Sequence, residues 1–309
     1  MSKTHVYDMI IVGGGPGGYT AAIYAASAGL DTLVLEKLSA GGQMALSEEI
    51  NNYPGFEEGV DGYTLAEKMQ RQAERFGART VYAEVERMEL AAEPKVLETS
   101  EGVFYARTVA LATGAGPREL GLADEAELVG RGVAYCAACD GMRYRGKTVV
   151  VVGGGNSAAG DALALSRIAE KVILVHRRDK LRATKAYDRP LSQAGNIEFR
   201  WNSAVVELLH GDKLSGARLR DVNTGEETEL ACDGVFISVG RKPATELVKG
   251  QLELDKNGYI AADETTKTSL PGVYAVGDVR TKALRQVVTA VADGAAAVHM
   301  AEEYLAGGE

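Results

Sequence analysis

The sequence predicts an α/β fold, because one unit of strand, glycine-rich turn and helix occurs in it twice. The first copy has an apolar strand at residues 6–12 and a turn at 13–18. The second has a strand at 148–152 and a turn at 153–158, 140 residues after the first turn. In each copy a helix of small residues and a second apolar strand follow the turn. Such an internal repeat indicates two Rossmann-like dinucleotide-binding domains.

The composition agrees with a globular protein of about two domains. The chain has 309 residues, of which 46% are hydrophobic and 25% charged, so each domain can bury its own core. The net charge of −9 argues against a nucleic-acid partner. Residues 1–8 contain no apolar signal segment, and no apolar run approaches the roughly 18 residues that a membrane helix needs. We therefore expect a cytoplasmic protein that does not span a membrane.

The first unit contains each part of a dinucleotide-binding fingerprint. Gly13 permits a tight turn, Gly15 lets the backbone approach a pyrophosphate, and Gly18 lets helix and strand pack closely. A helix is predicted over residues 19–29. The next strand ends at Glu36, whose carboxylate can accept hydrogen bonds from a ribose. A glycine motif alone is weak evidence, but together with the strand, the helix and the acidic residue it specifically indicates dinucleotide binding.

Two matching strands mark where the chain crosses between the domains. The apolar stretches 108–114 and 234–240 both end in glycine, and a proline follows each glycine three residues later. We therefore expect the second domain to be inserted in the first. The predicted boundaries are residues 1–116 and 242–309 for the two segments of the outer domain and 117–241 for the inserted domain. An amphipathic helix is predicted over 63–76 and short strands over 80–107.

The second unit differs from the first at the end of its second strand. That strand ends at His176, in the place that Glu36 holds in the first unit, and Arg177, Arg178 and Arg182 follow. Arginines in a cluster usually form a solvated surface patch, but at this position they suit a ribose that carries a 2′-phosphate. We therefore expect NADP(H) rather than NAD(H) at this unit.

A pair of cysteines precedes the second unit, in the order Cys136-Ala137-Ala138-Cys139-Asp140. A helix start bends the backbone so that two such thiols can form a disulfide, and it lowers the pKa of a thiol. Asp140 is the nearest proton donor for a leaving thiolate. Half of a zinc site is the competing interpretation. A zinc site needs four ligands, but the sequence contains no second C-x-x-C. The remaining thiol and imidazoles are those of Cys232, His5, His176, His210 and His299. We therefore expect redox chemistry, with Cys232 an inert core thiol.

The C-terminal segment places a carboxylate beside a helix start. An apolar strand leads to Asp278, and a helix is predicted over 284–305 with Arg285, Gln286 and Val287 at its start. Aspartate is common at helix starts in general. After this strand, however, Asp278 can hold a ribityl hydroxyl, and the positive helix end favours the anionic charge of a reduced flavin.

Together these residues resemble the low-molecular-weight bacterial thioredoxin reductases over nearly the whole chain. The resemblance rests on the turns at Gly13 and Gly153, the cysteine motif, Gly41-Gly42-Gln43, Asn52-Tyr53-Pro54-Gly55, His176-Arg177-Arg178 with Arg182, and Asp278 with Arg285-Gln286. It implies an NADPH-dependent thioredoxin-disulfide reductase with FAD in the outer domain and NADPH in the inserted one. It also implies oxidised thioredoxin as substrate and a cytoplasmic homodimer.

The resemblance assigns residues to three sites. The catalytic residues would be Cys136, Cys139 and Asp140, and no metal is implied. The residues for FAD would be Gly13, Gly15, Pro16, Gly18, Glu36, Lys37, Gly42, Gln43, Asn52, Thr113, Gly114, Asp278, Arg285, Gln286 and Val287. The residues for NADPH would be Gly153, Gly155, Asn156, Ser157, His176, Arg177, Arg178, Arg182 and Gly240.

The implied cycle passes hydride from NADPH to FAD and then electrons from the flavin, through Cys139, to the Cys136–Cys139 disulfide. The dithiol then reduces the disulfide of thioredoxin, and Asp140 shuttles a proton; which cysteine attacks thioredoxin stays open. Because the cysteine pair belongs to the inserted domain, nicotinamide and disulfide can visit the flavin only in turn. We therefore expect the domains to rotate about the crossings near Gly114 and Gly240.

One departure from the family concerns the partner protein. Many relatives carry two aromatic residues directly after Cys-Asp-Gly, where this chain has Met142 and Arg143, although Arg131 fits the family pattern. An unusual thioredoxin or a glutaredoxin-like protein is therefore a second candidate partner.

Three further classes of protein agree less well with the sequence. A peroxiredoxin-reductase flavoprotein would have an added N-terminal domain, a type-two ferredoxin reductase would lack the cysteine pair, and a redox-inactive nucleotide sensor would not need it.

Overall fold

The computed structural model describes residues 5–47 and 49–307. Contacts divide the chain into two compact units, unit 1 with residues 1–116 and 242–309 and unit 2 with residues 117–241. Unit 2 is therefore inserted in unit 1 along the chain. Of the N-terminal stretch expected to lack a signal segment, residues 1–4 lie outside the described range.

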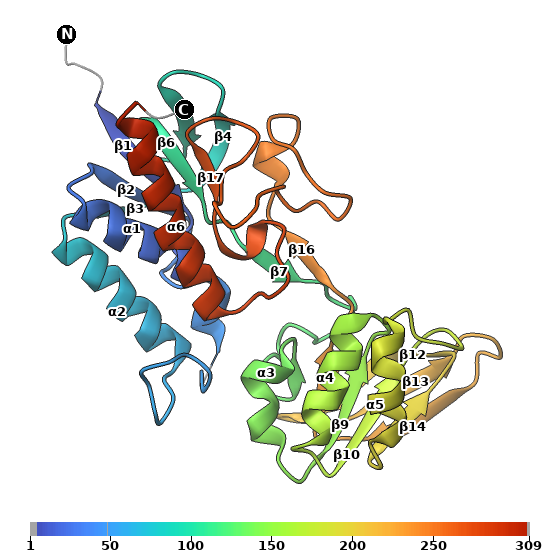
Figure 1. The fold of residues 1–309 in the computed structure, drawn as a ribbon. Coiled ribbons are helices and arrows are strands. Elements are labelled where there is room, and N and C mark those ends of the chain that lie inside the picture. Colours follow the sequence, from blue (N-terminus) through green and yellow to red (C-terminus); the bar gives the residue numbers. More distant parts are fainter. Residues whose placement is uncertain (1–4, 48, 308–309) are drawn as a thin grey trace. The chain divides into compact units, whose positions relative to one another are not determined.

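Unit 1 is built on a mixed sheet with the strand order β3-β2-β1-β6-β5-β4, and β17 lies beside β6 (Figure 1). β1 pairs in parallel with β2 and β6, and β4 and β5 form an antiparallel extension. The carboxyl ends of the parallel strands meet at one edge, where nucleotides bind in such sheets. The strands are β1 (Val6–Val12), β2 (Thr32–Glu36), β3 (Arg79–Tyr82), β4 (Val85–Glu89), β5 (Lys95–Thr99), β6 (Gly102–Leu111) and β17 (Val273–Ala275).

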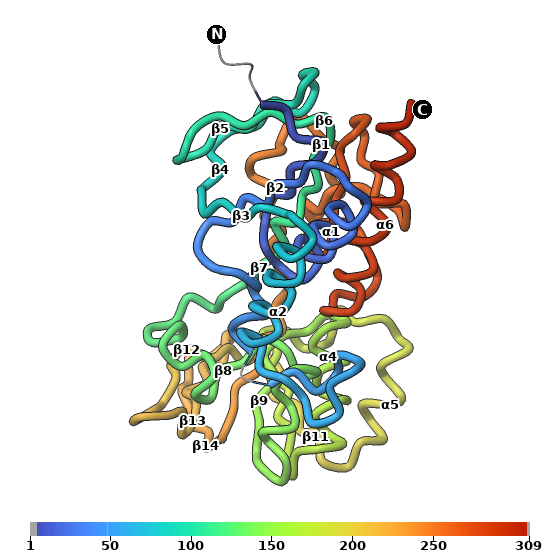
Figure 2. Tube along the Cα trace, turned by 90° about the vertical axis from the view of Figure 1, so that its left-hand side faces the viewer, coloured from blue at the N-terminus to red at the C-terminus, as the bar shows by residue number. Residues whose placement is uncertain are grey.

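Both faces of strand β1 are buried, which explains its nearly continuous apolar sequence. Met9 and Ile11 belong to a core that includes residues of helices α1, α2 and α6. Ile10 and Val12 belong to a second core, which includes residues of β4 and β5. Helices α1 and α6 lie side by side (Figures 1 and 2). The helices of unit 1 are α1 (Pro16–Ser27), α2 (Gly62–Arg75) and α6 (Val287–Leu305), with short 3₁₀ turns η1 (Gly42–Leu46), η4 (Glu246–Val248) and η5 (Gly277–Val279).

Unit 2 contains a parallel sheet with the order β11-β10-β9-β15-β8 and a separate antiparallel sheet β12-β13-β14. Helix α4 packs with Val149 and Val151 on one face of β9, and the antiparallel sheet packs with Val150 and Val152 on the other. The strands are β8 (Val133–Ala134), β9 (Thr148–Val152), β10 (Lys171–Val175), β11 (Ile197–Arg200), β12 (Ser203–His210), β13 (Leu214–Asp221), β14 (Glu227–Ala231) and β15 (Gly234–Ile237). The helices are α3 (Ala137–Asp140), α4 (Asn156–Ser166) and α5 (Asp188–Gln193), with η2 (Gly141–Tyr144) and η3 (Lys185–Tyr187).

The two crossings, β7 (Ala115–Pro117) and β16 (Arg241–Pro243), pair with each other. Strands β6 and β15 end before the expected limits of 114 and 240. Gly114 and Gly240 have φ angles of 72° and 113°, and such left-handed backbone cannot continue a strand.

The predicted α/β class is confirmed, and α1, α2 and α6 begin and end within three residues of their predicted limits. Helix α1 begins at Pro16 rather than Tyr19, because proline suits the first helical position. Helix α6 begins at Val287, since Gln286 and Thr289 form a capping box there. Within residues 5–47 and 49–307, none of the helices combines the length and apolar character required to cross a bilayer.

Candidate active site

Cys136 and Cys139 form a disulfide with their Cα atoms 5.3 Å apart, a separation within the usual range for disulfides. Cys136 has an extended backbone directly before α3, and its carbonyl accepts the N–H of Cys139 at 3.2 Å and of Asp140 at 3.0 Å. This single turn folds the second cysteine back onto the first. Both cysteines and Asp140 are partly exposed.

The third thiol, Cys232, behaves differently. It is buried between β14 and β15, and burial, reinforced by the nearby Asp233 carboxylate, raises its pKa to about 12. A thiol with so high a pKa carries almost no thiolate at neutral pH and is inert. Among the residues that the structure describes, no group of three or more His, Cys, Asp or Glu side chains could hold a metal ion.

The residues after the cysteine motif present a mixed surface. Met142 is 47% exposed, and the Arg143 guanidinium donates to the carbonyl of Gly130 at 3.1 Å. The Arg131 guanidinium donates to the Asp212 carbonyl. Arg143 therefore ties the cysteine motif to the loop that carries Arg131.

In unit 1, the glycine-rich turn has the geometry of a phosphate site. A Cβ on Gly18 would lie 1.9 Å from the Gly13 carbonyl oxygen, so only glycine fits there. A Cβ on Gly15 would meet no atom within 4 Å, and no side chain caps the start of α1. The first N–H groups of α1 therefore lack a side-chain cap, and the space at Gly15 beside them is open. Glu36 accepts the Gly14 N–H at 2.5 Å, which fixes its carboxylate beside the turn.

Other residues predicted for the same site come to this edge from distant segments. The Gly41 N–H donates to the Gly14 carbonyl at 2.7 Å, which brings η1, with Gly42 and the exposed Gln43, onto the turn. The Asn52 amide donates to the Gln286 side chain at 3.0 Å. Gln286 and Val287 form the start of α6, which packs against α1.

Arg285 shapes this region through the backbone. Its guanidinium donates to the carbonyls of Asp278, Arg280 and Lys282 at 3.0–3.3 Å and lies 3.9 Å above the Tyr259 ring. These contacts fold the loop between η5 and α6, and so place Asp278.

Two predicted residues make contacts other than with the glycine turn. The Lys37 ammonium pairs with Glu84 at 2.6 Å on the surface. The Thr113 hydroxyl donates to the Ala244 carbonyl at 2.8 Å, next to Gly114 at the crossing. Neither contact was predictable, since both partners lie outside the motifs.

The second nucleotide unit is also open at its helix start. A Cβ on Gly155 would meet no atom within 4 Å, and α4 lacks a side-chain cap. The Asn156 side chain accepts the Thr184 N–H at 2.8 Å, and the Arg182 N–H donates to the Gly154 carbonyl at 2.6 Å, so the arginine loop is tied to the turn. Gly153 lies within this turn, while Ser157 and Gly240 are exposed.

His176 lies at the centre of the cationic cluster. It is 5% exposed, and its Nε2 has no hydrogen-bond partner within the described part of the chain. Burial and then the charges of Arg182, Arg178 and Arg177 lower its pKa, so the ring is neutral at pH 7. The three arginines are exposed and lie close enough to His176 to affect its pKa.

Sequence reasoning missed several residues around these sites. Trp201 lies edge-on to His176 at 6.4 Å, just after β11. The Ser238 hydroxyl donates to the Asp161 carboxyl at 2.5 Å, between β15 and α4. Trp201 is the sole tryptophan of the sequence, and its place at the end of a strand next to the His176 strand was a usable signal. Asp161 offered none.

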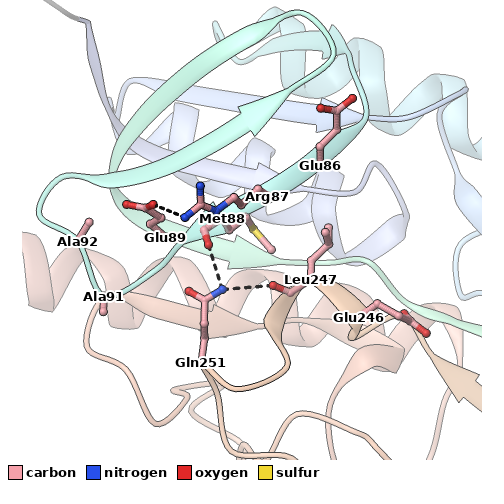
Figure 3. A pocket seen from close by; sticks show the side chains of 9 residues that line it. All are labelled: Glu86, Arg87, Met88, Glu89, Ala91, Ala92, Glu246, Leu247 and Gln251. Carbon is pink, nitrogen blue, oxygen red and sulfur yellow. Dashed lines mark hydrogen bonds and ion pairs between the residues drawn. The ribbon is translucent and has the colours of Figure 1, made fainter.

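A pocket of about 550 Å³ lies in unit 1 between β4 and η4, away from all predicted site residues. Gln251 spans it, with its amide bonded to the carbonyls of Met88 at 3.0 Å and Leu247 at 3.3 Å (Figure 3). This glutamine also accepts the Leu90 N–H. The pocket is therefore a strand-to-turn junction with satisfied polar groups.

Comparison with known proteins identifies the family. The profile of the pyridine nucleotide-disulphide oxidoreductases matches residues 7–294. The thioredoxin reductase of Treponema pallidum is 44% identical to this chain, and the alignment covers 97% of each protein. The thioredoxin reductase of Streptomyces clavuligerus is 46% identical, and the alignment covers 97% of this chain and 94% of the relative. The chain belongs to this oxidoreductase family, among the thioredoxin reductases. A thioredoxin reductase structure from Streptococcus pyogenes superposes with a TM-score of 0.89 at 42% identity, covering 98% of this chain and 99% of the other.

The family resemblance and the two dinucleotide-binding domains predicted from the sequence are thus confirmed. Thioredoxin reductases of this family use FAD and NADPH. The residues present fit both groups. The open helix starts at Gly15 and Gly155 can each receive a pyrophosphate, and the orphaned Nε2 of His176 and its arginines suit a polar, anionic ligand.

Proposed function

We propose that the protein is an NADPH-dependent thioredoxin-disulfide reductase. The observation that carries the proposal is the partly exposed Cys136–Cys139 disulfide, in a chain that also contains two open dinucleotide turns. Similarity to thioredoxin reductases over nearly the full chain supports it. FAD would bind unit 1, where Glu36 and Asp278 suit its ribose and ribityl hydroxyls, and NADPH would bind unit 2 through the three arginines near His176.

When bound, NADPH would supply a hydride to FAD, and the reduced flavin would supply the electron pair to the disulfide. The Cys136–Cys139 bond then breaks, and the two sulfurs take up two electrons and two protons to become thiols. We place Cys139 on the electron-accepting side by family resemblance. Asp140 follows Cys139 in the same turn and would hold and return the proton.

The reduced pair would then act on the partner by thiol–disulfide exchange. One thiolate attacks the partner's disulfide, a mixed disulfide forms, and the partner's other sulfur leaves as a thiolate. The second cysteine attacks the mixed disulfide, which restores the Cys136–Cys139 bond and releases the reduced partner. The expected partner is thioredoxin. The exposed Met142 in place of an aromatic residue makes a glutaredoxin-like protein the second candidate.

The deciding assay follows NADPH oxidation with oxidised thioredoxin or glutaredoxin present. Cys136→Ser and Cys139→Ser should reduce thioredoxin-dependent turnover to background, whereas Cys232→Ala, which removes the buried thiol, should stay active. Turnover by either serine variant at a rate near wild type would refute the mechanism. Faster turnover with glutaredoxin than with any thioredoxin would change the partner but not the chemistry.

We also propose that the two units rotate about the crossings during turnover. The positive φ angles of Gly114 and Gly240, at the ends of the crossing segments, support hinges there. A chemical cross-link between the units should stop turnover yet leave one half-reaction intact. Unimpaired turnover in the cross-linked enzyme would contradict rotation.

Assembly and location complete the proposal. We propose a cytoplasmic homodimer, and apolar side chains on unit 1 that are 51–80% exposed support an interface with a second copy: Tyr24, Leu38, Leu46 and Tyr63. Sedimentation equilibrium should report twice the mass of the chain. A monomer at micromolar concentration would contradict the dimer.

A further inference from the structure

Glu125 is a buried carboxylate that belongs to none of the motifs above. The residue is 3% exposed. Its Oε1 accepts the Leu120 N–H at 3.0 Å, and its Oε2 accepts the N–H groups of Gly121 at 2.9 Å and Leu122 at 3.1 Å. Three successive backbone N–H groups around one carboxylate form a compact anion-holding turn. The position of this side chain is therefore fixed by the backbone of residues 120–122.

The same carboxylate holds the residue before the first redox cysteine. The Tyr135 hydroxyl donates to Glu125 Oε1 at 2.8 Å, and Cys136 follows directly. The Tyr135 ring packs against the same buried core of unit 2 as Leu120 and Leu122. Burial, together with the Glu125 carboxylate, raises the pKa of the Tyr135 phenol, so it stays a donor at neutral pH.

The held segment begins at the domain crossing. The Arg118 N–H donates to the Gly240 carbonyl at 3.0 Å, two residues before Leu120. At the other end, β8 pairs with β15 immediately before Tyr135, and α3 begins immediately after Cys136. Glu125 therefore joins the start of unit 2 to the backbone of the redox pair.

We propose that Glu125 and Tyr135 are positioning residues for the redox disulfide. They hold the backbone at Cys136 so that the two cysteine Cα atoms remain 5.3 Å apart when the bond opens. Two thiols held at disulfide distance have a high effective concentration toward each other, which favours the oxidised pair. The inference rests on the proposed function in one respect, namely that this disulfide is reduced and re-formed.

Loss of the tether should make the disulfide easier to reduce. Tyr135→Phe removes only the hydroxyl and keeps the packed ring. We expect the equilibrium constant for disulfide formation to fall about tenfold, which for this two-electron couple is a reduction potential about 30 mV more positive. Glu125→Gln cannot accept all three backbone N–H groups and should shift the potential in the same direction.

The test measures the potential directly. The holoenzyme is equilibrated in dithiothreitol buffers of known potential, quenched in acid and alkylated after denaturation. Mass spectrometry then counts one label for the oxidised chain and three for the reduced one, since Cys232 is the third thiol. The matched controls are Tyr187→Phe, in the same unit, and Glu127→Gln, an exposed neighbour. Both should keep the wild-type potential.

The outcomes separate the two claims. A Tyr135→Phe potential equal to that of the controls overturns the positioning role, even where Glu125→Gln fails to fold. A wild-type disulfide that stays oxidised at every potential overturns the proposed function instead.

Discussion

Asp293 and Arg280 form a bidentate ion pair in the interior of unit 1, with Oδ1 2.7 Å from Nη2 and Oδ2 2.9 Å from Nε. Both side chains are 7% exposed. Oδ2 also accepts the Lys282 ammonium at 2.7 Å and the Gly277 N–H at 2.8 Å. One carboxylate on α6 therefore pairs with two buried cations and fixes the turn that carries Asp278.

Asp293→Asn should destabilise unit 1 strongly, because it leaves two buried cations without a counter-charge. Breaking a buried ion pair from one side costs about 3–5 kcal/mol, and we expect a loss of that order in the free energy of unfolding, measured in urea. Glu302→Gln, exposed on the same helix, is the control and should change it by less than about 0.5 kcal/mol. Equal stability of the two variants would show that the network contributes little.

The same network predicts a pH dependence. Burial alone would raise the Asp293 pKa, but the hydrogen bonds and charges of Arg280 and Lys282 bring it below the ordinary value. A carboxyl with a lowered pKa in the folded state contributes stability above its unfolded pKa and loses it as the pH falls through the folded pKa. The stability difference between wild type and Asp293→Asn should therefore shrink in acid. A difference that is constant from about pH 3 to pH 7 would contradict this.

Local signals account for what the sequence predicted correctly. Apolar runs that end in glycine turns located β1, β9 and both nucleotide units, because strand, turn and helix lie within one continuous stretch. The redox pair was equally local, since Cys136 and Cys139 share one turn. Helix limits were less accurate, because a cap such as Gln286 depends on a side chain three residues away.

The supporting carboxylates could not be predicted in the same way. Asp293 meets Arg280 across a loop, and Asp161 meets Ser238 between segments 77 residues apart. Glu125 reaches Tyr135 only because a backbone turn holds it. In an acidic chain such residues look like ordinary surface charges, and only the packing of distant elements distinguishes them.

Gly294→Ala should separate α6 from α1. A Cβ on Gly294 would lie 2.4 Å from the Gly17 carbonyl oxygen and 2.8 Å from the Ala21 nitrogen, both backbone atoms that cannot move aside alone. Overpacking of this kind costs about 1–3 kcal/mol, and thermal unfolding should show it. Gly160→Ala on α4 is the matched control, because its Cβ would meet nothing closer than 3.8 Å. That control should be neutral or stabilising by up to about 1 kcal/mol.

The arginine cluster should determine the choice of nicotinamide cofactor. Replacing Arg177 and Arg178 together by alanine removes two charges that suit a 2′-phosphate, each such contact contributing about 1.5–3 kcal/mol. We expect KM for NADPH to rise at least about tenfold, with KM for NADH nearly unchanged, in steady-state turnover. Arg167→Ala, at the other end of α4 from the glycine turn, should change neither. An equal rise in KM for NADPH and for NADH would show that Arg177 and Arg178 do not recognise the 2′-phosphate.

Asp161 should make the protein less stable as the pH rises. Burial raises its pKa, and the hydrogen bond from Ser238 and the charge of Arg241 only partly oppose this. A carboxyl that binds its proton more tightly in the folded state stabilises the fold below its unfolded pKa, and that stability is lost as the pH rises through the folded pKa. Asp161→Asn keeps the shape of the neutral carboxyl without its ionisation. Relative to wild type, its thermal midpoint should therefore rise as the pH increases from about 3 to about 8, beginning near the unfolded aspartate pKa of about 3.9. Asp212→Asn, exposed in the same unit, should follow the wild-type profile. If the midpoints of Asp161→Asn and wild type run parallel over this range, the Asp161 carboxyl titrates alike in the folded and unfolded chain.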